Sequence, residues 1–210
     1  MHRILFTFSL LFWSICIGQS YQKMEDMEDV ELLKTQLTLK SENTSTIRAQ
    51  FEEYIYSSLL KNPKICKGSL TYSKEGSLRW EKTSPKKEII LTDGKAIQHQ
   101  IDGKIKNDSA TKKIVKRLES LLVKLLSAEF LESDQFELTF FENKDSYKIT
   151  LVPKKKNSAK HLAQIDLIFT KANLELHHLT LQENTFDYIS YKFIDVRYNT
   201  TIHPNLFKKI

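Results

Sequence analysis

The stretch GSLTYSKEGSLRWEKTSPKKEIILTDGK, from Gly68 to Lys95, decides the fold of this chain. Its apolar residues, such as Leu70, Tyr72, Leu78 and Trp80, alternate with polar residues in short runs. The runs are separated by KEGS, TSPKK and TDGK, which are turn signals built from Gly, Pro, Asp and Ser. Strands joined by such short connections are antiparallel neighbours, so the stretch predicts an antiparallel meander.

A second block of strands is expected toward the end of the chain. The segments QFELTFFE, DSYKITLV, AQIDLIFT, LELHHLTLQ and DYISYKFIDVRYN alternate in the same way, and NKD, KAN and ENTFD supply the turns. Ile165, Leu167 and Phe169 give the clearest alternation. No composition break separates the two blocks, so both are expected to belong to one domain.

Apolar residues at helical spacing predict two helices. Between residues 24 and 39, Met27, Val30, Leu33 and Leu37 lie three or four apart, which is typical of an amphipathic helix. Between Ile114 and Leu126 the apolar stripe is broader, and such a helix must lie on the sheet.

The segment from Ile47 to Ile55 is ambiguous, because its apolar residues fit a strand and a helix equally well. Periodicity alone leaves both structures open at this point.

The first residues have the pattern of a secretory signal peptide, assigned here to residues 1–20. A basic start is followed by an apolar run from Ile4 to Ile17 and by the small or polar residues GQS. The run is too short to span a bilayer comfortably. We therefore expect an exported, soluble domain over residues 21–210, with Cys66 as its one cysteine, no internal disulfide and an apolar core that stabilises the fold.

The sequence gives little sign of catalysis, cofactor binding or nucleic-acid binding. The net charge of +6 is modest, and the clusters KKIVKR at residues 112–117 and KKK at residues 154–156 lack interleaved aromatic residues. His177 and His178 are neighbours in a predicted strand, so they should point to opposite faces and bind no common metal. The adjacent acids Glu52 and Glu53 are interpreted as solvated charges. We expect no enzyme, no metal and no cofactor.

The order of motifs resembles that of the periplasmic outer-membrane lipoprotein carrier family, LolA. Members carry a G-x-L strand, a basic turn, an aromatic-Trp strand, a Pro turn and an S/T-D-G-K turn. The matching residues here are Gly68, Leu70, Lys74, Trp80, Pro85 and TDGK at residues 92–95. AQFEE at residues 49–53 and the closing FIDVRYNTTIHPNLF extend the resemblance over nearly the whole chain.

The resemblance implies an α+β, mainly β fold: an unclosed antiparallel half-barrel with helices covering its concave apolar face. It favours a strand for residues 47–55. It implies a monomeric periplasmic carrier that shields the acyl chains of lipoproteins between an inner-membrane releasing transporter and an outer-membrane acceptor. The residues expected to line the acyl-chain cavity are Phe51, Leu70, Tyr72, Leu78, Trp80, Leu118, Leu121, Leu122 and Leu125. Ordinary core packing is the alternative role for each of them.

In the family, an arginine in the turn after the G-x-L strand bonds to the backbone of a lid helix and latches the empty cavity. Lys74 stands at this position, followed by Glu75 where members have proline. Lysine is a point donor rather than a planar fork. Gln98 and His99 also replace an aromatic pair.

Two other functions stay open. The cargo of such a carrier could be a non-protein lipid or a lipid-like envelope product. A polar cleft in which His99 met acidic side chains would instead favour a non-carrier envelope protein, a sensor or an enzyme, on the same scaffold.

Overall fold

The computed structural model describes residues 20–106, 116, 120, 122–155, 162–208 and 210. Its strands form one antiparallel sheet of twelve, in the order β1-β8-β9-β10-β11-β12-β2-β3-β4-β5-β6-β7. The first block comprises β2 (Thr46–Tyr56), β3 (Lys64–Ser73), β4 (Ser77–Ser84), β5 (Glu88–Asp93), β6 (Ile97–Ile101) and β7 (Lys104–Ile105), whereas β1 (Gln22–Lys23) pairs with β8 at the edge of the second block. The second comprises β8 (Phe136–Glu142), β9 (Ser146–Pro153), β10 (Gln164–Thr170), β11 (Leu176–Gln182) and β12 (Tyr188–Tyr198). The two predicted meanders meet where β12 pairs with β2.

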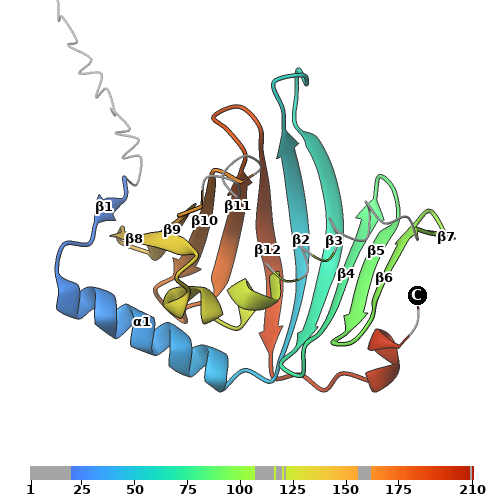
Figure 1. The fold of residues 1–210 in the computed structure, drawn as a ribbon, viewed down its shortest axis with the longest axis horizontal. Coiled ribbons are helices and arrows are strands. Elements are labelled where there is room, and N and C mark those ends of the chain that lie inside the picture. Colours follow the sequence, from blue (N-terminus) through green and yellow to red (C-terminus); the bar gives the residue numbers. More distant parts are fainter. Residues whose placement is uncertain (1–19, 107–115, 117–119, 121, 156–161, 209) are drawn as a thin grey trace, which may run out of the picture.

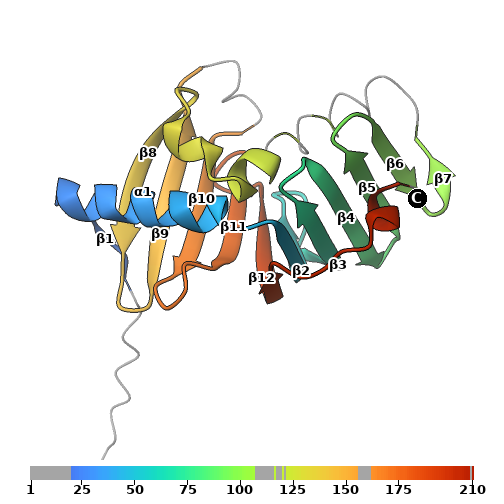
Figure 2. The ribbon, with the colours of Figure 1, turned by 90° about the horizontal axis from the view of Figure 1, so that it is seen from below.

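The sheet is strongly curved, and its two edge strands, β1 and β7, do not pair with each other (Figure 1). Helix α1 (Met27–Glu42) and the 3-10 helix η1 (Glu129–Glu132) lie across its concave side, together with the helical residues 122–126 (Figure 2). An open, mainly β half-barrel with helices on its concave face is therefore confirmed. In the described part of the chain, no helix is both long and apolar enough to cross a membrane.

Helix α1 begins where the side chain of Asp26 accepts a hydrogen bond of 2.8 Å from the backbone of Glu28. Val30, Leu33 and Leu37 are buried against the sheet, as their spacing predicts. The prediction for Met27 is wrong, because this residue is 66% exposed. The first turn of α1 extends past the edge of the sheet, where no strand lies under it (Figure 2).

The ambiguous segment is the strand β2, which pairs with β12 on one side and β3 on the other. Ile47, Ala49, Phe51 and Glu53 are buried on its concave side. Ladder hydrogen bonds on both sides favour the extended backbone, which local periodicity could not decide.

The convex face is covered at one place by the 3-10 helix η2 (Pro204–Phe207). Its Phe207 packs with Ile89 and Leu91, whereas Ile90 between them belongs to the main core on the concave side. The consecutive burial of Ile89, Ile90 and Leu91, in a run of four that ends at Thr92, thus reflects packing on both faces of the sheet.

Two irregularities change which side chains face inward. At Asp195, φ is 52°, and the register between β12 and β2 shifts by one residue. Val196 and Tyr198 therefore reach the same cavity as Phe193, against the strict alternation of the sequence.

A second register shift, beside His177, corrects our prediction for the two adjacent histidines. The rings of His177 and His178 do not point to opposite faces but pack edge to face, with their centroids 4.5 Å apart. Burial and the neighbouring His177 lower the pKa of His178 to about 4, so this ring is neutral near neutral pH.

Gly68 allows an aromatic cluster to form at the centre of the sheet. The ring of Phe51 lies across Gly68 and stacks on Trp80 with a centroid distance of 4.3 Å. Tyr191 from β12 packs edge-on against both rings, at 5.8 Å and 5.0 Å. A Cβ atom at position 68 would overlap both the Phe51 ring and the carbonyl oxygen of Glu81.

The substitution Gly68→Ala should therefore lower the free energy of unfolding by about 3 kcal/mol, at the upper end for overpacked cores, because a backbone carbonyl cannot move aside easily. Urea denaturation followed by circular dichroism measures this loss. Ser69→Ala, one residue on and facing the other side of β3, is the control and should change stability by less than about 0.5 kcal/mol. Equal losses in the two variants would contradict this account of Gly68.

Candidate functional site

An apolar cavity of about 60 Å³ lies between α1, residues 125–130 and the concave face of the sheet. Its lining is Leu37, Lys40, Ser41, Thr44, Ile47, Ala49, Leu70, Leu125, Leu126, Ala128, Phe130, Phe169, Leu174, Leu176, Phe193, Val196 and Tyr198. Most of these side chains are aliphatic or aromatic, so the cavity suits hydrocarbon rather than a charged ligand.

A larger space of about 410 Å³ adjoins this cavity and shares Ser41, Thr44 and Leu126 with it. It lies between the end of α1, the β3–β4 turn and residues 123–129, and its lining is mixed. The polar lining includes Glu42, Lys74, Glu75, Ser127 and Glu129, and the apolar lining includes Tyr72, Val123 and Leu126. We call this space the mouth, because it places a polar rim beside an apolar interior.

Two lysines hold the last turn of α1 in place. Lys74 donates a hydrogen bond of 2.8 Å from Nζ to the backbone carbonyl of Glu42, the last residue of the helix. A cation at this end satisfies a free carbonyl and complements the helix dipole. Lys40 donates to the carbonyl of Asn173 and lies 4.2 Å from the centre of the Tyr198 ring, and its burial lowers its pKa.

The predicted cavity residues fall into three groups. Leu70 and Leu125 line the apolar cavity, and Tyr72 lines the mouth. Four more are buried in the same core cluster without lining either space: Phe51, Leu78, Trp80 and Leu122. Leu118 and Leu121 lie outside the described residues.

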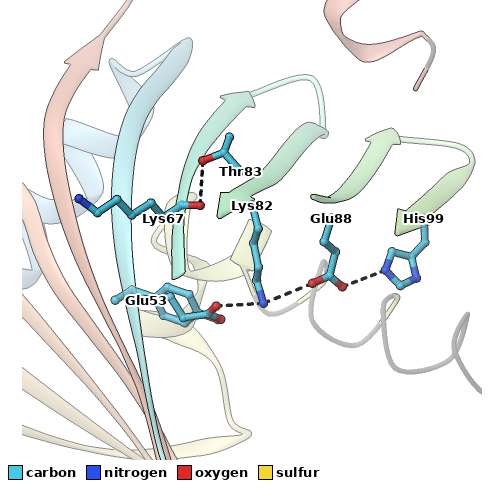
Figure 3. A network of polar contacts seen from close by, with 7 residues as sticks. Glu53, Lys67, Lys82, Thr83, Glu88 and His99 are labelled. Atoms are coloured by element: carbon cyan, nitrogen blue, oxygen red, sulfur yellow. Dashed lines mark hydrogen bonds and ion pairs between the residues drawn. The ribbon is translucent and has the colours of Figure 1, made fainter. Parts of the chain in front are cut away.

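A chain of polar contacts crosses the other half of the concave face, from β2 to β6 (Figure 3). Lys82 lies between two carboxylates, with its Nζ atom 3.0 Å from Glu53 Oε2 and 3.3 Å from Glu88 Oε2. The second oxygen of Glu88 is 2.9 Å from His99 Nε2. Tyr191 donates a hydrogen bond of 2.8 Å to the second oxygen of Glu53.

Our interpretation of Glu53 as a solvated charge is wrong, because this residue is 1% exposed. Glu53 is the next residue in the alternating series Ile47, Ala49 and Phe51, whose side chains face inward from β2. This alternation was the signal in the sequence that could have predicted the burial of Glu53. Glu52, which faces the other way, is only partly buried and lies 3.5 Å from Lys67.

The charges in this chain of contacts stabilise one another. Burial alone would lower the pKa of Lys82, but Glu53 and Glu88 outweigh it and raise that pKa. Burial would likewise raise the pKa of Glu88, but Lys82 and His99 outweigh it and lower that pKa. Burial, followed by the charge of Glu53, raises the pKa of Tyr191 well above its usual value. Lys82 therefore carries a positive charge between two carboxylates, and this charge compensates for the removal of both carboxylates from water.

The meeting of His99 with Glu88 is one of the features that we associated with a non-carrier function. Nδ1 of His99 is buried and has no hydrogen-bond partner among the residues that the structure describes, so neither ring nitrogen is open to a polar ligand. Both carboxylates are likewise already engaged by Lys82. Within the described ranges, no group of three or more His, Cys, Asp or Glu side chains is placed to hold a metal ion.

Cys66 lies beside Glu53 on the same face and is buried. Burial, followed by the charge of Glu53, raises the pKa of its thiol. The neighbouring Lys64 lowers that pKa by less, so the thiol is protonated and inert rather than a nucleophile.

The fold and the cavity together define a class of protein: an open antiparallel half-barrel that covers an apolar space with helices. A sequence profile of the outer membrane lipoprotein carrier protein LolA matches residues 42–209, and this chain belongs to the LolA family. An outer-membrane lipoprotein carrier protein of Coxiella burnetii is 24% identical over 176 residues, which cover 83% of this chain and 81% of that protein.

Two solved structures have a similar course of the chain. The lipoprotein LppX of Mycobacterium tuberculosis matches with a TM-score of 0.44 and 11% identity, over 84% of this chain and 98% of that one. A LolA superfamily protein of Nitrosomonas europaea matches with a TM-score of 0.40 and 8% identity, over 85% of this chain and 97% of that one.

The buried ion pair makes a prediction about stability. Lys82→Met should lower the free energy of unfolding by about 3 kcal/mol, because Glu53 would remain buried without its cation. Urea denaturation measures the loss. In the double variant Glu53→Gln, Lys82→Met the loss should be smaller than the sum of the two single losses.

Lys87→Met is the matched control for Lys82→Met. Lys87 is 58% exposed and lies 3.5 Å from Glu81, so its removal should cost less than about 1 kcal/mol. If Lys82→Met cost no more than this control, the contact with Glu53 would have no energetic importance.

Proposed function

We propose that this chain is a periplasmic carrier that shields the acyl chains of lipoproteins and moves them from the inner to the outer membrane. In this proposal residues 1–20 are a cleaved signal peptide, and residues 21–210 form one monomeric carrier domain. The observation that carries it is the apolar cavity under α1 and η1, in a chain that belongs to a family described as lipoprotein carriers. A releasing transporter and an outer-membrane acceptor would be its partners.

The size of the cavity implies that binding requires opening. Pockets that enclose drug-sized ligands measure roughly 300–1,000 Å³, whereas the apolar cavity measures about 60 Å³. The helices must therefore move away from the sheet before an acyl chain can enter. Such a movement would also expose Phe51, Leu78, Trp80 and Leu122, which we propose as lining residues of the open state.

The free energy of opening would set the affinity for the cargo. Each methylene group removed from water contributes about 0.8 kcal/mol, so several acyl chains would bind too tightly to be released from a preformed cavity. A closed resting state subtracts its own stability from the affinity. The bond from Lys74 to Glu42 is part of that stability, and we propose it as the latch.

A carrier of a non-protein lipid is the second candidate. The polar contacts from Glu53 to His99 lie on the concave face, and His99 stands in β6 where the family resemblance predicts an aromatic residue. Polar groups in this half of the concave face favour a lipid cargo that has a polar headgroup attached to its hydrocarbon chain.

Native mass spectrometry with lipid extraction, on protein purified from its own periplasm, tests the proposal. Co-purifying triacylated lipoprotein would support the lipoprotein carrier. A free lipid would favour the second candidate. A protein that carries neither, and that binds no fluorescent fatty-acid analogue in solution, would contradict both and favour the non-carrier function.

The latch makes a prediction about affinity. Lys74→Met should raise the affinity for a fluorescent fatty-acid analogue about two- to five-fold, because a cation at an exposed helix end contributes roughly 0.3–1 kcal/mol to the closed state. Fluorescence titration measures this change. Lys144→Met, in the β8–β9 turn, is the control and should leave the affinity unchanged.

Lys74→Arg separates the latch from a general effect of charge. It retains a donor at the same carbonyl, so its affinity should be equal to or below that of the original chain. If Lys74→Met bound the analogue no more tightly than Lys74→Arg, the bond to Glu42 would not hold the cavity closed.

A further inference from the structure

Two neighbouring connections expose large apolar side chains at one edge of the sheet. This edge is formed by the ends of the strands and their connections, not by the edge strands β1 and β7. Leu59 is 91% exposed and Leu60 is 47% exposed, both between β2 and β3. Phe186, between β11 and β12, is 70% exposed. Because β2 pairs with β12, these connections lie side by side, and the β2–β3 hairpin projects beyond its neighbours (Figure 1). We call Leu59, Leu60 and Phe186 the apolar tip.

The apolar tip is held in a fixed shape by polar contacts between the two connections. Asp187 accepts hydrogen bonds from the backbone and hydroxyl groups of Ser58, at 2.7 Å and 3.2 Å. Asn184 donates a further hydrogen bond to Asp187, at 2.7 Å. The rings of Tyr56 and Tyr188 stack below, 4.3 Å apart. The polar groups of both loops are thus satisfied by each other, while the apolar side chains point outward.

Three of the six other large exposed apolar residues in the described part of the chain also lie near this edge. In the described part of the chain, the remaining large ones are Ile65, Ile105 and Val152, near the ends of strands that reach this edge, and Met27, Leu32 and Leu39 on α1. A concentration of exposed apolar side chains at one edge marks a surface that contacts protein or membrane.

Charge separates the two edges of the sheet. The connections of the edge with the apolar tip, together with the strand residues that flank them, carry the exposed lysines Lys61, Lys64, Lys86, Lys87, Lys104, Lys154 and Lys155. The carboxylates of the same connections and flanking residues are Glu88, Asp102, Asp134, Glu183 and Asp187, two fewer than the lysines. The opposite edge, which includes the β3–β4 turn and the mouth, has more carboxylates than lysines. Its lysines are Lys74, Lys95, Lys144 and Lys171, and its carboxylates are Glu42, Glu75, Asp93, Glu142, Asp145 and Glu175.

We propose that the edge with the apolar tip binds the surface of an anionic phospholipid membrane, with Leu59, Leu60 and Phe186 inserted between the lipids and the lysines beside the headgroups. A projecting tip suits a bilayer better than a groove in a partner, since it can enter the acyl region without a matching surface. One apolar anchor combined with a basic surface supplies the two contributions that stable membrane association requires. The inference does not depend on the nature of the cargo.

The proposed contact also fixes an orientation. The mouth lies at the other edge of the sheet, so Lys74 should stay in water while Phe186 enters the lipid. The inserted residue would be within the acyl boundary, about 5–10 Å deep.

The test is co-flotation of the mature chain with vesicles of phosphatidylcholine alone and of phosphatidylcholine mixed with phosphatidylglycerol. We expect binding to the mixed vesicles, which weakens as salt is added, because exposed charges are screened. The triple variant Leu59→Ser, Leu60→Ser, Phe186→Ser should lose at least about ten-fold in partitioning. Lys61→Gln with Lys64→Gln should lose about twenty-five-fold at low salt, since each lysine near the surface contributes about five-fold.

Matched controls are available on the same chain. Leu32 and Leu39 on α1 are exposed to 56% and 51%, so Leu32→Ser with Leu39→Ser removes exposed apolar surface elsewhere and should not alter binding. Lys95→Gln with Lys144→Gln removes two charges from the opposite edge and should likewise have little effect. Phe186→Trp should shift its emission to the blue on mixed vesicles, whereas an environment-sensitive label at Lys74→Cys should not respond.

Three results would overturn the proposal. The first is absence of binding to mixed vesicles at low salt. The second is equal loss of binding in the α1 control and the apolar-tip variant, which would indicate non-specific adsorption. The third is an apolar tip that binds no vesicle but is needed for contact with a membrane protein, which would assign this edge to a protein partner. None of these results depends on whether an acyl chain binds in the cavity.

Discussion

The structure depends on one close approach, in which the ring of Phe51 lies over Gly68 and stacks on Trp80. The three residues come from the three consecutive strands β2, β3 and β4, and Tyr191 from β12 closes the cluster from the other meander. A side chain at position 68 would overlap both the Phe51 ring and the backbone of β4. The packing at the centre of the concave face therefore relies on a residue that has no side chain.

The concave face is divided into two chemically different halves by this cluster. On the side of β8 to β12, α1 covers aliphatic and aromatic residues and leaves a small apolar cavity. On the side of β2 to β6, Lys82 bridges Glu53 and Glu88. Buried charges of this kind seldom add stability over an apolar core, so their presence on a face otherwise suited to hydrocarbon is better explained by the function of this surface than by folding.

Much of the fold could be predicted because alternation and turn residues are local signals. The meander from Gly68 to Lys95 needs only neighbouring residues to be recognised. What could not be predicted depends on partners far away in the sequence. The bulges at Asp195 and beside His177 reverse the facing of the residues that follow, and no local rule announces them. Lys82 continues the inward parity of Leu78 and Trp80 in β4, but its partners Glu53 and Glu88 come from β2 and β5. A lysine read alone is interpreted as solvated.

The way in which α1 is held determines how the cavity can open. At its C-terminal end, Lys74 binds the carbonyl of Glu42, and the side chain of Asn199 bonds to Ser45 and to the carbonyl of Asn43. At its N-terminal end, the helix is attached through β1, a strand of two residues that pairs only with β8. A ladder this short contributes little, and it lies at an open edge of the sheet. In the proposed opening, the N-terminal end of α1 would therefore be the end that moves, with the connection at residues 43–45 as its hinge. The bond from Lys74 to Glu42 lies beside this connection, so as the proposed latch it would bias the angle of the helix over the cavity.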